Sequence, residues 1–350
     1  MSSQRPAGLN IRSQRQSADQ HRTVFSVQVA PGGQSFTVEP GENILAAGRR
    51  QGVWLPFECG WGSCSTCKVT LVSGEVKLLL PDAPAVDERD QRRRRIIVCQ
   101  TTPLSDLVIR PVRVDTEPPS ERPVVDRTGR LRKVEDLGPD IRRLGFDLDG
   151  PARYRSGQHA VVTLDGGLRR CYSMANAPNG PQVDLLVKRY AGRPGSTAMF
   201  ALEEGDCLPI TLPFGDMWIR DGTAPIVLIA GGTGISAVHA LAAELATRRQ
   251  DREVTAFYGA RSLPELVLAS ELEAHITRLG RGRYHFVLEH PPPQWTHASG
   301  YVTDALARHL SVAPDGHYYL AGPPPMVDAT LDFLKGLDVG RDRIHYDRFG

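Results

Sequence analysis

The chain has 350 residues, of which 41% are hydrophobic and 23% are charged. This length and composition predict a globular protein of two to three domains. The formal net charge of +2 gives no basis for bulk electrostatic binding of nucleic acid or membrane surfaces, and six cysteines are too few for a disulfide scaffold.

The first 22 residues are rich in Ser, Gln and Arg, which predicts a disordered tail. They contain no apolar signal segment and no adjacent pair of arginines. No stretch of the chain reaches 18 uninterrupted apolar residues. We therefore expect a cytoplasmic protein without membrane insertion, in which clustered cysteines indicate metal or redox chemistry.

The tail is followed by a region of short strands and few helices, residues 23–112. Alternating and apolar runs predict strands at 24–30, 35–38, 68–72, 96–98 and 107–111, helices at 42–51 and within 85–95, and a Gly/Cys-rich loop at 57–67. This mixture in about 90 residues predicts a compact α+β module.

Residues 113–123 have the Pro-rich, charged composition of a linker. Short strand signals separated by Gly and Pro predict an antiparallel β-barrel over 124–221. From 222 to 350 the pattern alternates, with strands at 226–230, 254–258, 284–288 and 318–321 and helices at 236–248, 264–279, 303–310 and 325–336. Alternation of this kind predicts a doubly wound parallel sheet, so the fold is multidomain.

Four cysteines have a spacing with a chemical meaning: Cys59, Cys64, Cys67 and Cys99. The pattern C-x4-C-x2-C followed by a distant cysteine is that of plant-type [2Fe-2S] sites, because two irons need four thiolates. A zinc site is the alternative, but zinc sites usually use two C-x2-C pairs and only one is present. Over residues 24–112 the sequence resembles the ferredoxin family, which implies a β-grasp fold. The remaining cysteines, Cys171 and Cys207, are expected to be ordinary buried thiols.

Two segments of the predicted barrel have residues suited to a flavin nucleotide. Arg170, Tyr172 and Ser173 form an R-x-Y-S sequence, in which the guanidinium suits a pyrophosphate and the aromatic ring a flavin. The stretch from Leu185 leads to Gly195-Ser196-Thr197 at the start of a helix, which suits a phosphate or is simply an N-cap.

Together these segments resemble the ferredoxin–NADP(+) reductase superfamily over residues 124–350. The resemblance implies FAD rather than FMN. It places Arg170, Tyr172, Ser173, Val187, Lys188, Gly195, Ser196 and Thr197 at the FAD site.

A third motif lies after the strand 226–230, where Gly231-Gly232-Thr233-Gly234 precedes a helix. Glycines let the backbone approach a pyrophosphate at a helix start, although a purely structural turn is the alternative. The loop resembles the G-G-T-G loop of the same superfamily. The next strand ends at Tyr258 and Arg261, where adenosine is expected. Because no Lys or Tyr follows to bind a second phosphate, the sequence favours NADH over NADPH.

The segment from Ala321 to Met326 resembles the superfamily's C-G-P-P-x-M motif, with Ala321 at the cysteine position. The resemblance places Gly322, Pro323 and Met326 at the nicotinamide, and puts the rate and orientation of hydride transfer in question. No residue is predicted to act as an acid or base. Hydride transfer is predicted at FAD, near Ser173, Ala321 and the terminal aromatic Phe349, which shields the ring or merely packs.

A ferredoxin followed by FAD and NAD units resembles the reductase components of bacterial multicomponent oxygenases. The resemblance implies an enzyme that passes electrons from NADH to FAD, to the [2Fe-2S] cluster and then to a separate oxygenase or its small ferredoxin. The expected partner is a diiron aromatic or alkene monooxygenase, consistent with aromatic hydrocarbon catabolism. A Rieske ring-hydroxylating dioxygenase and a cytochrome P450 remain alternatives. We expect a monomer that binds no nucleic acid.

Three further hypotheses remain open. The basic run Arg92 to Arg95 either docks an acidic oxygenase or is a solvated helix face. In one rival hypothesis the reductase half is inactive and the chain is only an electron carrier. Its support is Ala321, which stands at the cysteine position of the motif. A redox regulator needs a signalling module, for which 350 residues leave no room.

Overall fold

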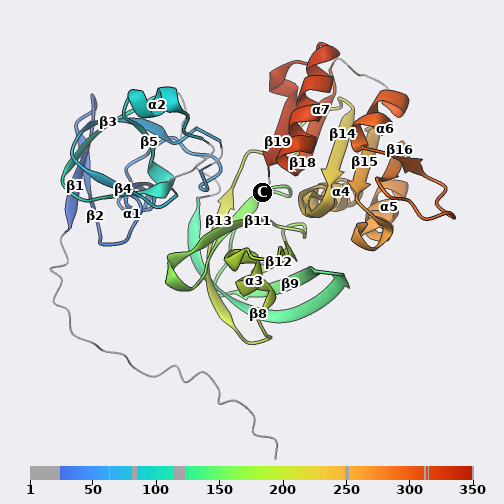
Figure 1. Ribbon diagram of the computed structural model, residues 1–350, viewed down its shortest axis with the longest axis horizontal. Helices are drawn as coiled ribbons and strands as arrows, with labels where there is room; N and C mark the ends of the chain where they lie inside the picture. Colours follow the sequence, from blue (N-terminus) through green and yellow to red (C-terminus); the bar gives the residue numbers. More distant parts are fainter. Residues whose placement is uncertain are drawn as a thin grey trace, which may run out of the picture.

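The computed structural model describes residues 24–62, 64–80, 85–113, 123–248, 252–310, 313 and 315–348. The predicted tail, most of the predicted linker and Phe349 lie outside these residues. The chain forms three units, and the middle one lies between the other two in the ribbon view (Figure 1). None of the helices in the described ranges is long and apolar enough to cross a membrane.

The first unit is a five-stranded sheet with two short helices. Its strand order is β2-β1-β7-β3-β5, with β1 and β7 parallel and the other pairs antiparallel. The elements are β1 (Phe25–Val29), β2 (Gln34–Val38), α1 (Ile44–Arg50), β3 (Lys68–Ser73), β4 (Val76–Leu78), α2 (Glu88–Arg92), β5 (Arg95–Ile97), η1 (Val98–Gln100), β6 (Thr101–Pro103) and β7 (Leu107–Pro111).

Most predicted elements of this unit are present, but the helix expected within 85–95 is shorter. It begins after Asp87, whose carboxylate accepts a hydrogen bond from the amide of Asp90 at 2.7 Å. It ends before Arg94, which has a φ of 51° that an α-helix does not allow. The strands β4 and β6, three residues each, were not predicted because so short a run has no readable period.

The second unit is a six-stranded antiparallel sheet with the order β11-β10-β13-β8-β9-β12. A bridge between Met174 and Leu185 joins its two outer strands, so the sheet closes into the predicted barrel. The elements are β8 (Val125–Gly138), β9 (Ile141–Leu148), β10 (His159–Thr163), η2 (Asp165–Gly167), β11 (Arg169–Ser173), β12 (Gln182–Lys188), α3 (Pro194–Phe200) and β13 (Cys207–Phe214).

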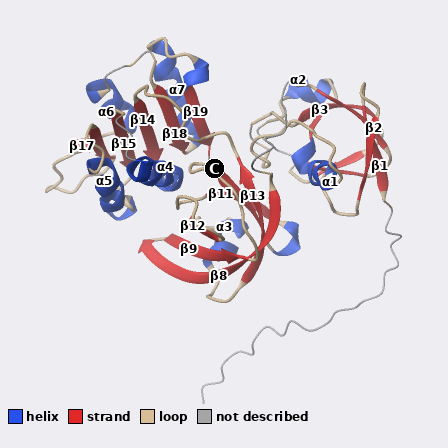
Figure 2. Cartoon of the chain, turned by 180° about the vertical axis from the view of Figure 1, so that it is seen from behind, coloured by secondary structure: helices blue, strands red, loops and turns tan. Residues whose placement is uncertain are grey.

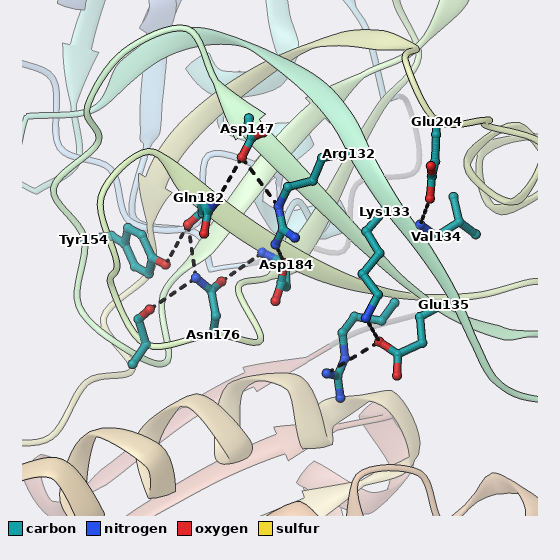
Figure 3. A network of polar contacts seen from close by, with 12 residues as sticks. Arg132, Lys133, Val134, Glu135, Asp147, Tyr154, Asn176, Gln182, Asp184 and Glu204 are labelled. Carbon is teal, nitrogen blue, oxygen red and sulfur yellow. Dashed lines mark hydrogen bonds and ion pairs between the residues drawn. The ribbon is translucent and has the colours of Figure 1, made fainter.

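A polar network ties the strands of the barrel wall together (Figure 3). Arg132 on β8 contacts Asp184 on β12 at 2.9 Å and Asp147 on β9 at 3.5 Å. The amide of Asn176 reaches the carbonyl of Gln182 at 3.0 Å. Because Arg132 on β8 contacts both β9 and β12, it stiffens this part of the barrel wall.

The third unit is the predicted parallel sheet, with the order β17-β16-β15-β14-β18-β19 and every pair parallel. Helices α4 and α5 cover one side of it and α6 and α7 the other (Figure 2). The elements are β14 (Ile226–Gly231), η3 (Gly232–Gly234), α4 (Ile235–Arg248), β15 (Val254–Ala260), η4 (Leu263–Glu265), α5 (Ala269–Thr277), β16 (Gly282–Leu288), β17 (Ala298–Ser299), α6 (Val302–His309), β18 (His317–Gly322), α7 (Pro324–Gly336), η5 (Arg341–Arg343) and β19 (Ile344–Arg348).

Two expectations for this unit need correction. The helix predicted over 264–279 is a 3-10 turn and a separate α5, because Leu268 between them has a left-handed φ of 58°. The strand β19 was not predicted, since the sequence IHYDR is largely polar. It nevertheless pairs along its whole length with β18.

Candidate redox site

The four predicted cluster cysteines come together at one end of the first unit. Cys99 in η1 lies beside Cys67, with 3.3 Å between their sulfur atoms. Cys64 lies beside Cys59, whose amide donates to the Cys64 sulfur at 3.4 Å. None of the four is in a disulfide, and only Cys64 is more than slightly exposed. The structure thus groups the cysteines as two pairs.

This pairing is the arrangement that a two-iron cluster requires, with two thiolates for each iron. The pKa of the Cys64 thiol is raised by its contact with Cys59, and the pKa of Cys99 by its contact with Cys67, with burial adding in both cases. Crowded thiolates need a compensating positive charge, which iron supplies. Within the described residues, no three His, Cys, Asp or Glu side chains surround one point suited to a single ion.

The loop around these cysteines also fits a cluster. The amides of Trp61 and Gly62 point at the Cys59 sulfur, at 3.3 and 3.4 Å, where they stabilise a thiolate. Gly60 has a φ of 63° and Gly62 a φ of 111°, values that residues with a Cβ rarely adopt. The chemistry and geometry of this loop therefore fit a [2Fe-2S] cluster.

The two predicted flavin segments meet at one place on the barrel. Arg170 on β11 packs so closely against Gly195 that a Cβ there would lie 2.5 Å from the Arg170 Nε. Ser173, on the same strand, is 4% exposed, and its hydroxyl has no hydrogen-bond partner among the described residues. A buried, unpartnered hydroxyl suits a flavin nucleotide, which offers it an acceptor, and an arginine on the same strand suits the nucleotide's phosphates. Tyr172 is half-buried on the same face of β11 as Arg170.

The other candidates for this site have protein partners already. The hydroxyls of Ser196 and Thr197 donate to the carbonyl of Arg193, at 3.2 and 2.9 Å. The ammonium of Lys188 forms an ion pair with Glu265 of the third unit at 2.7 Å. Val187 is fully buried in the barrel core, so its side chain offers no surface to a ligand.

The glycine loop and the Gly-Pro-Pro motif pack directly on one another at the carboxyl edge of the parallel sheet. A Cβ on Gly234 would lie 2.1 Å from the carbonyl oxygen of Ala321, and one on Gly231 would lie 2.2 Å from the Met326 sulfur. Gly232 has a φ of 53° and open space where a side chain would stand. Open backbone above a strand end and a helix start suits a nucleotide pyrophosphate.

The remaining residues of this group are divided between the surface and the core. Thr233 accepts a hydrogen bond from the Ser236 hydroxyl at 2.6 Å, and Pro323 precedes the first residue of α7. Arg261 is exposed just after β15. Tyr258, by contrast, is fully buried in the core between the sheet and α5. Its ring has no exposed surface, whereas the side chain of Arg261 does.

A cavity of about 370 Å³ lies where the three units meet. It is lined by Glu58, Cys59, Trp61, Cys64, Ser65, Thr66, Arg113, His159, Cys171, Asp216, Ile344, His345, Tyr346, Asp347 and Arg348. Cys171 of the R-x-Y-S strand thus faces the cluster loop, and burial raises its pKa. Cys207 is exposed, which contradicts the expectation of a buried thiol.

Sequence reasoning missed the residues that join the cluster loop to the barrel. The His159 ring nitrogen Nε2 is 2.8 Å from the carbonyl oxygen of Cys59, and an Arg169 guanidinium nitrogen donates to that of Cys99 at 3.1 Å. The amide of Gly215 donates to the carbonyl of Glu58 at 2.8 Å. No motif marks these residues, because their partners lie 70 or more positions away in the chain.

The same ferredoxin and reductase patterns are found by comparison with protein families. The chain matches the models of a 2Fe-2S iron-sulfur cluster binding domain over residues 27–104, an oxidoreductase FAD-binding domain over 128–218 and an oxidoreductase NAD-binding domain over 228–332. The reductase component of phenol 2-monooxygenase from Pseudomonas sp. is 36% identical, over 93% of this chain and 94% of that protein. The chain belongs to the family of reductase components of multicomponent oxygenases.

Other relatives of the reductase serve different oxygenases. The ferredoxin–NAD(+) reductase component of the alkene monooxygenase system of Xanthobacter autotrophicus is 33% identical, over 91% of this chain and 98% of its own length. Among solved structures, the ferredoxin reductase in carbazole 1,9a-dioxygenase matches with a TM-score of 0.82 and 30% identity, over 94% of this chain and 99% of that chain.

These findings confirm the predicted family, the three-part fold and the enzyme class. The reductase is an oxidoreductase that uses a [2Fe-2S] cluster, FAD and NAD, and it serves an oxygenase.

Proposed function

We propose that this reductase oxidises NADH and delivers the electrons, one at a time, to the hydroxylase of a diiron aromatic or alkene monooxygenase in the cytoplasm. When bound, the nicotinamide supplies a hydride, the flavin accepts its two electrons, and the cluster takes them singly. One NADH therefore serves two one-electron deliveries and leaves one proton. The observation that carries the proposal is the direct contact of the paired-cysteine loop with β11, the strand of Arg170 and Ser173.

The proposed division follows the sequence boundaries: a tail at 1–22, a ferredoxin unit at 23–112, a linker at 113–123, an FAD unit at 124–221 and an NAD unit at 222–350. Cys59, Cys64, Cys67 and Cys99 would hold the cluster. Arg170, Tyr172, Ser173, Gly195, Ser196, Thr197 and the main chain of Val187 and Lys188 would hold FAD.

At the nicotinamide site, we propose that Gly232, Thr233 and Gly234 hold the pyrophosphate and that Gly322, Pro323 and Met326 line the nicotinamide pocket. Close packing of Gly234 on Ala321 supports this, because it brings the two motifs into contact. Arg261 is placed to contact the adenosine. NADH is favoured over NADPH because no second cationic or phenolic residue follows Arg261 before Glu265.

The partner is proposed from the relatives, since several are named for phenol, alkene and propane monooxygenases. A Rieske dioxygenase or a P450 is the second candidate, supported by similarity to solved structures named as the ferredoxin reductase in carbazole 1,9a-dioxygenase and as a cytochrome P450 reductase from Amycolatopsis. On α2 and the turn after it, Arg89, Arg92, Arg93 and Arg94 are exposed, whereas Arg95 is paired with Asp90 at 3.1 Å. Arg92 also lies 3.9 Å from Glu88. Exposed arginines a few residues before Cys99 in the chain suit an acidic partner, whether oxygenase or small ferredoxin. We propose a monomer.

The test is an anaerobic absorption spectrum of the purified protein before and after one equivalent of NADH. We expect flavin and iron–sulfur bands that bleach together with NADH and much more slowly with NADPH. Bands that respond only to dithionite would show an inactive reductase half. Bands absent after anaerobic reconstitution would overturn the cluster assignment.

A further inference from the structure

One hairpin of the barrel, β10–β11, contacts the cysteine site at two points, one in the cluster loop and one at Cys99 in η1. His159 begins β10 and contacts the carbonyl of Cys59, and Arg169 begins β11 and contacts the carbonyl of Cys99. These cysteines belong to different thiol pairs, so each pair has one direct contact with the barrel. In the antiparallel register His159 lies opposite Ser173 and Arg169 opposite Thr163, which places the two contacts at opposite ends of the hairpin.

The orientation of His159 follows from its neighbours. A carbonyl oxygen only accepts hydrogen bonds, so the Nε2 facing Cys59 must carry the proton. The other ring nitrogen, Nδ1, faces the Asp347 carboxylate of β19 at 3.6 Å, which is beyond hydrogen-bond length, so Asp347 holds the ring by charge as an ion pair with the protonated imidazole. The His159 side chain is 4% exposed and that of Asp347 12%. This site therefore takes one residue from each of the three units.

Close packing leaves the imidazole little room to turn. Its ring stacks on Phe214 with 6.1 Å between centroids, and Phe214 in turn packs against Phe57 of the cluster loop. A Cβ on Gly215 would lie 2.8 Å from the His159 Nδ1, and one on Gly60 would lie 2.5 Å from the Phe214 ring. Both glycines are thus required for the cluster loop to sit this close to the barrel.

The strand that carries Arg169 also carries Arg170 and Ser173, the residues proposed for the flavin. The Arg169 side chain is partly buried, and the charge it places beside Cys99 becomes more favourable when a cluster gains an electron. The hairpin is therefore a rigid connection between the two redox sites.

We propose that His159, oriented by Asp347, and Arg169 are positioning residues that fix the cluster loop against the flavin strand and so set the rate of electron entry into the cluster. Arg169 also raises the reduction potential of the cluster. The inference rests on the proposed function and names the residues that make its internal electron transfer efficient.

The experiment uses the full-length protein with its cofactors, mixed anaerobically with NADH in a stopped-flow instrument. Flavin bleaching reports hydride transfer, and the later bleaching of the iron–sulfur bands reports electron entry into the cluster. In His159→Phe we expect the first phase to stay within about twofold and the second to slow about tenfold, because even a small displacement of the cluster loop from the flavin strand lowers the rate of a positioned reaction by an order of magnitude or more. His159→Gln, whose amide still donates, should recover most of the rate.

Redox titration of Arg169→Met should give a lower cluster potential than the wild type.

The matched control is Arg49→Gln. Arg49 crosses the same boundary: it donates to the carbonyl of Val124 at 3.1 Å, pairs with Asp126 at 3.8 Å and lies 5.9 Å from the centre of the Phe214 ring, and none of these contacts among the described residues involves a cluster cysteine. Its second phase should be unchanged. A normal second phase in His159→Phe, or an equal loss in Arg49→Gln, would overturn the inference.

Two further measurements keep the outcomes separate. Iron and flavin contents show whether His159→Phe has lost its cofactors. If it has, the milder Asp347→Asn is used instead, and its second phase is expected to slow about threefold. If NADH does not bleach the flavin of the wild type, the proposed function is overturned. If the flavin bleaches normally and the second phase of the His159 and Asp347 variants is also normal, only the inference is overturned.

Discussion

The barrel meets its two neighbours through contacts of different kinds. Towards the ferredoxin unit it mainly offers donors to backbone carbonyls of the cluster loop and of Cys99, from His159, Arg169 and the Gly215 amide, beside one ion pair of Asp126 with Arg49 at 3.8 Å. Towards the NAD unit it mainly offers charged side chains, with Lys188 paired to Glu265 at 2.7 Å and Arg143 to Glu271 at 2.6 Å, beside one contact of the Ala175 carbonyl with the His239 ring at 2.8 Å.

The two boundaries should therefore respond differently to salt and acid. Partly exposed ion pairs are screened by salt and contribute little individually, about 0–1 kcal/mol. A backbone carbonyl oxygen does not titrate, so acid does not remove the acceptor of these hydrogen bonds. The difference suits the reaction, because nucleotide must enter and leave beside the NAD unit while the cluster must keep its place.

The largest effect is expected from Cys99→Ser, which removes one thiolate from the pair with Cys67. The cluster should be lost or strongly depleted, because a hydroxyl binds iron poorly, while NADH still bleaches the flavin. Iron analysis together with the absorption spectrum measures both. Retention of the full iron content would show that Cys99 is not a ligand.

The next effect tests the close approach of the cluster loop to the barrel. In Gly60→Ala the new methyl group would strike the Phe214 ring, so we expect destabilisation by about 2–4 kcal/mol, from the left-handed backbone and the overlap together. Gly180→Ala has a similar φ but open space, and should cost only about 1–2 kcal/mol. Denaturant unfolding followed by the iron–sulfur absorbance compares them, and equal losses would show that the boundary is loose.

A smaller effect is expected from Lys188→Met at the NAD boundary. Losing the pair with Glu265 should cost about 1 kcal/mol, less in high salt than in low salt. Lys133→Met removes an ion pair to Glu135 within the barrel and should cost under about 0.5 kcal/mol. Urea unfolding at two salt concentrations measures both, and a salt-independent loss at Lys188 would contradict the assigned ionic character.

The smallest effect concerns pH. The His239 imidazole at 3.2 Å lowers the pKa of Glu271 to about 2, and the Arg143 guanidinium adds to this. A lowered carboxyl pKa gives stability that is present above the ordinary value of 4.5 and is lost as the pH falls towards 2. In Glu271→Gln, melting temperatures between pH 5 and 3 should fall less steeply than in the wild type. Parallel curves would show that this carboxylate does not couple the units.

The sequence by itself determined the order of the three units, the four cysteines proposed to bind the cluster, and the alternation of strands and helices that forms the parallel sheet. These features are local, because cysteine spacing, glycine loops and hydrophobic period act within a few tens of residues. The same reasoning fails where a run is short or polar, as for β4 and β19.

Only the tertiary structure decided which side chains meet. It buried Tyr258 in the core, paired Lys188 with Glu265, and brought His159 against the cluster loop and Asp347. These contacts join segments 70 or more residues apart, and no local propensity encodes them. They depend on how three separately predictable units pack, since hydrogen bonds and charges at a boundary form only once both surfaces are in place.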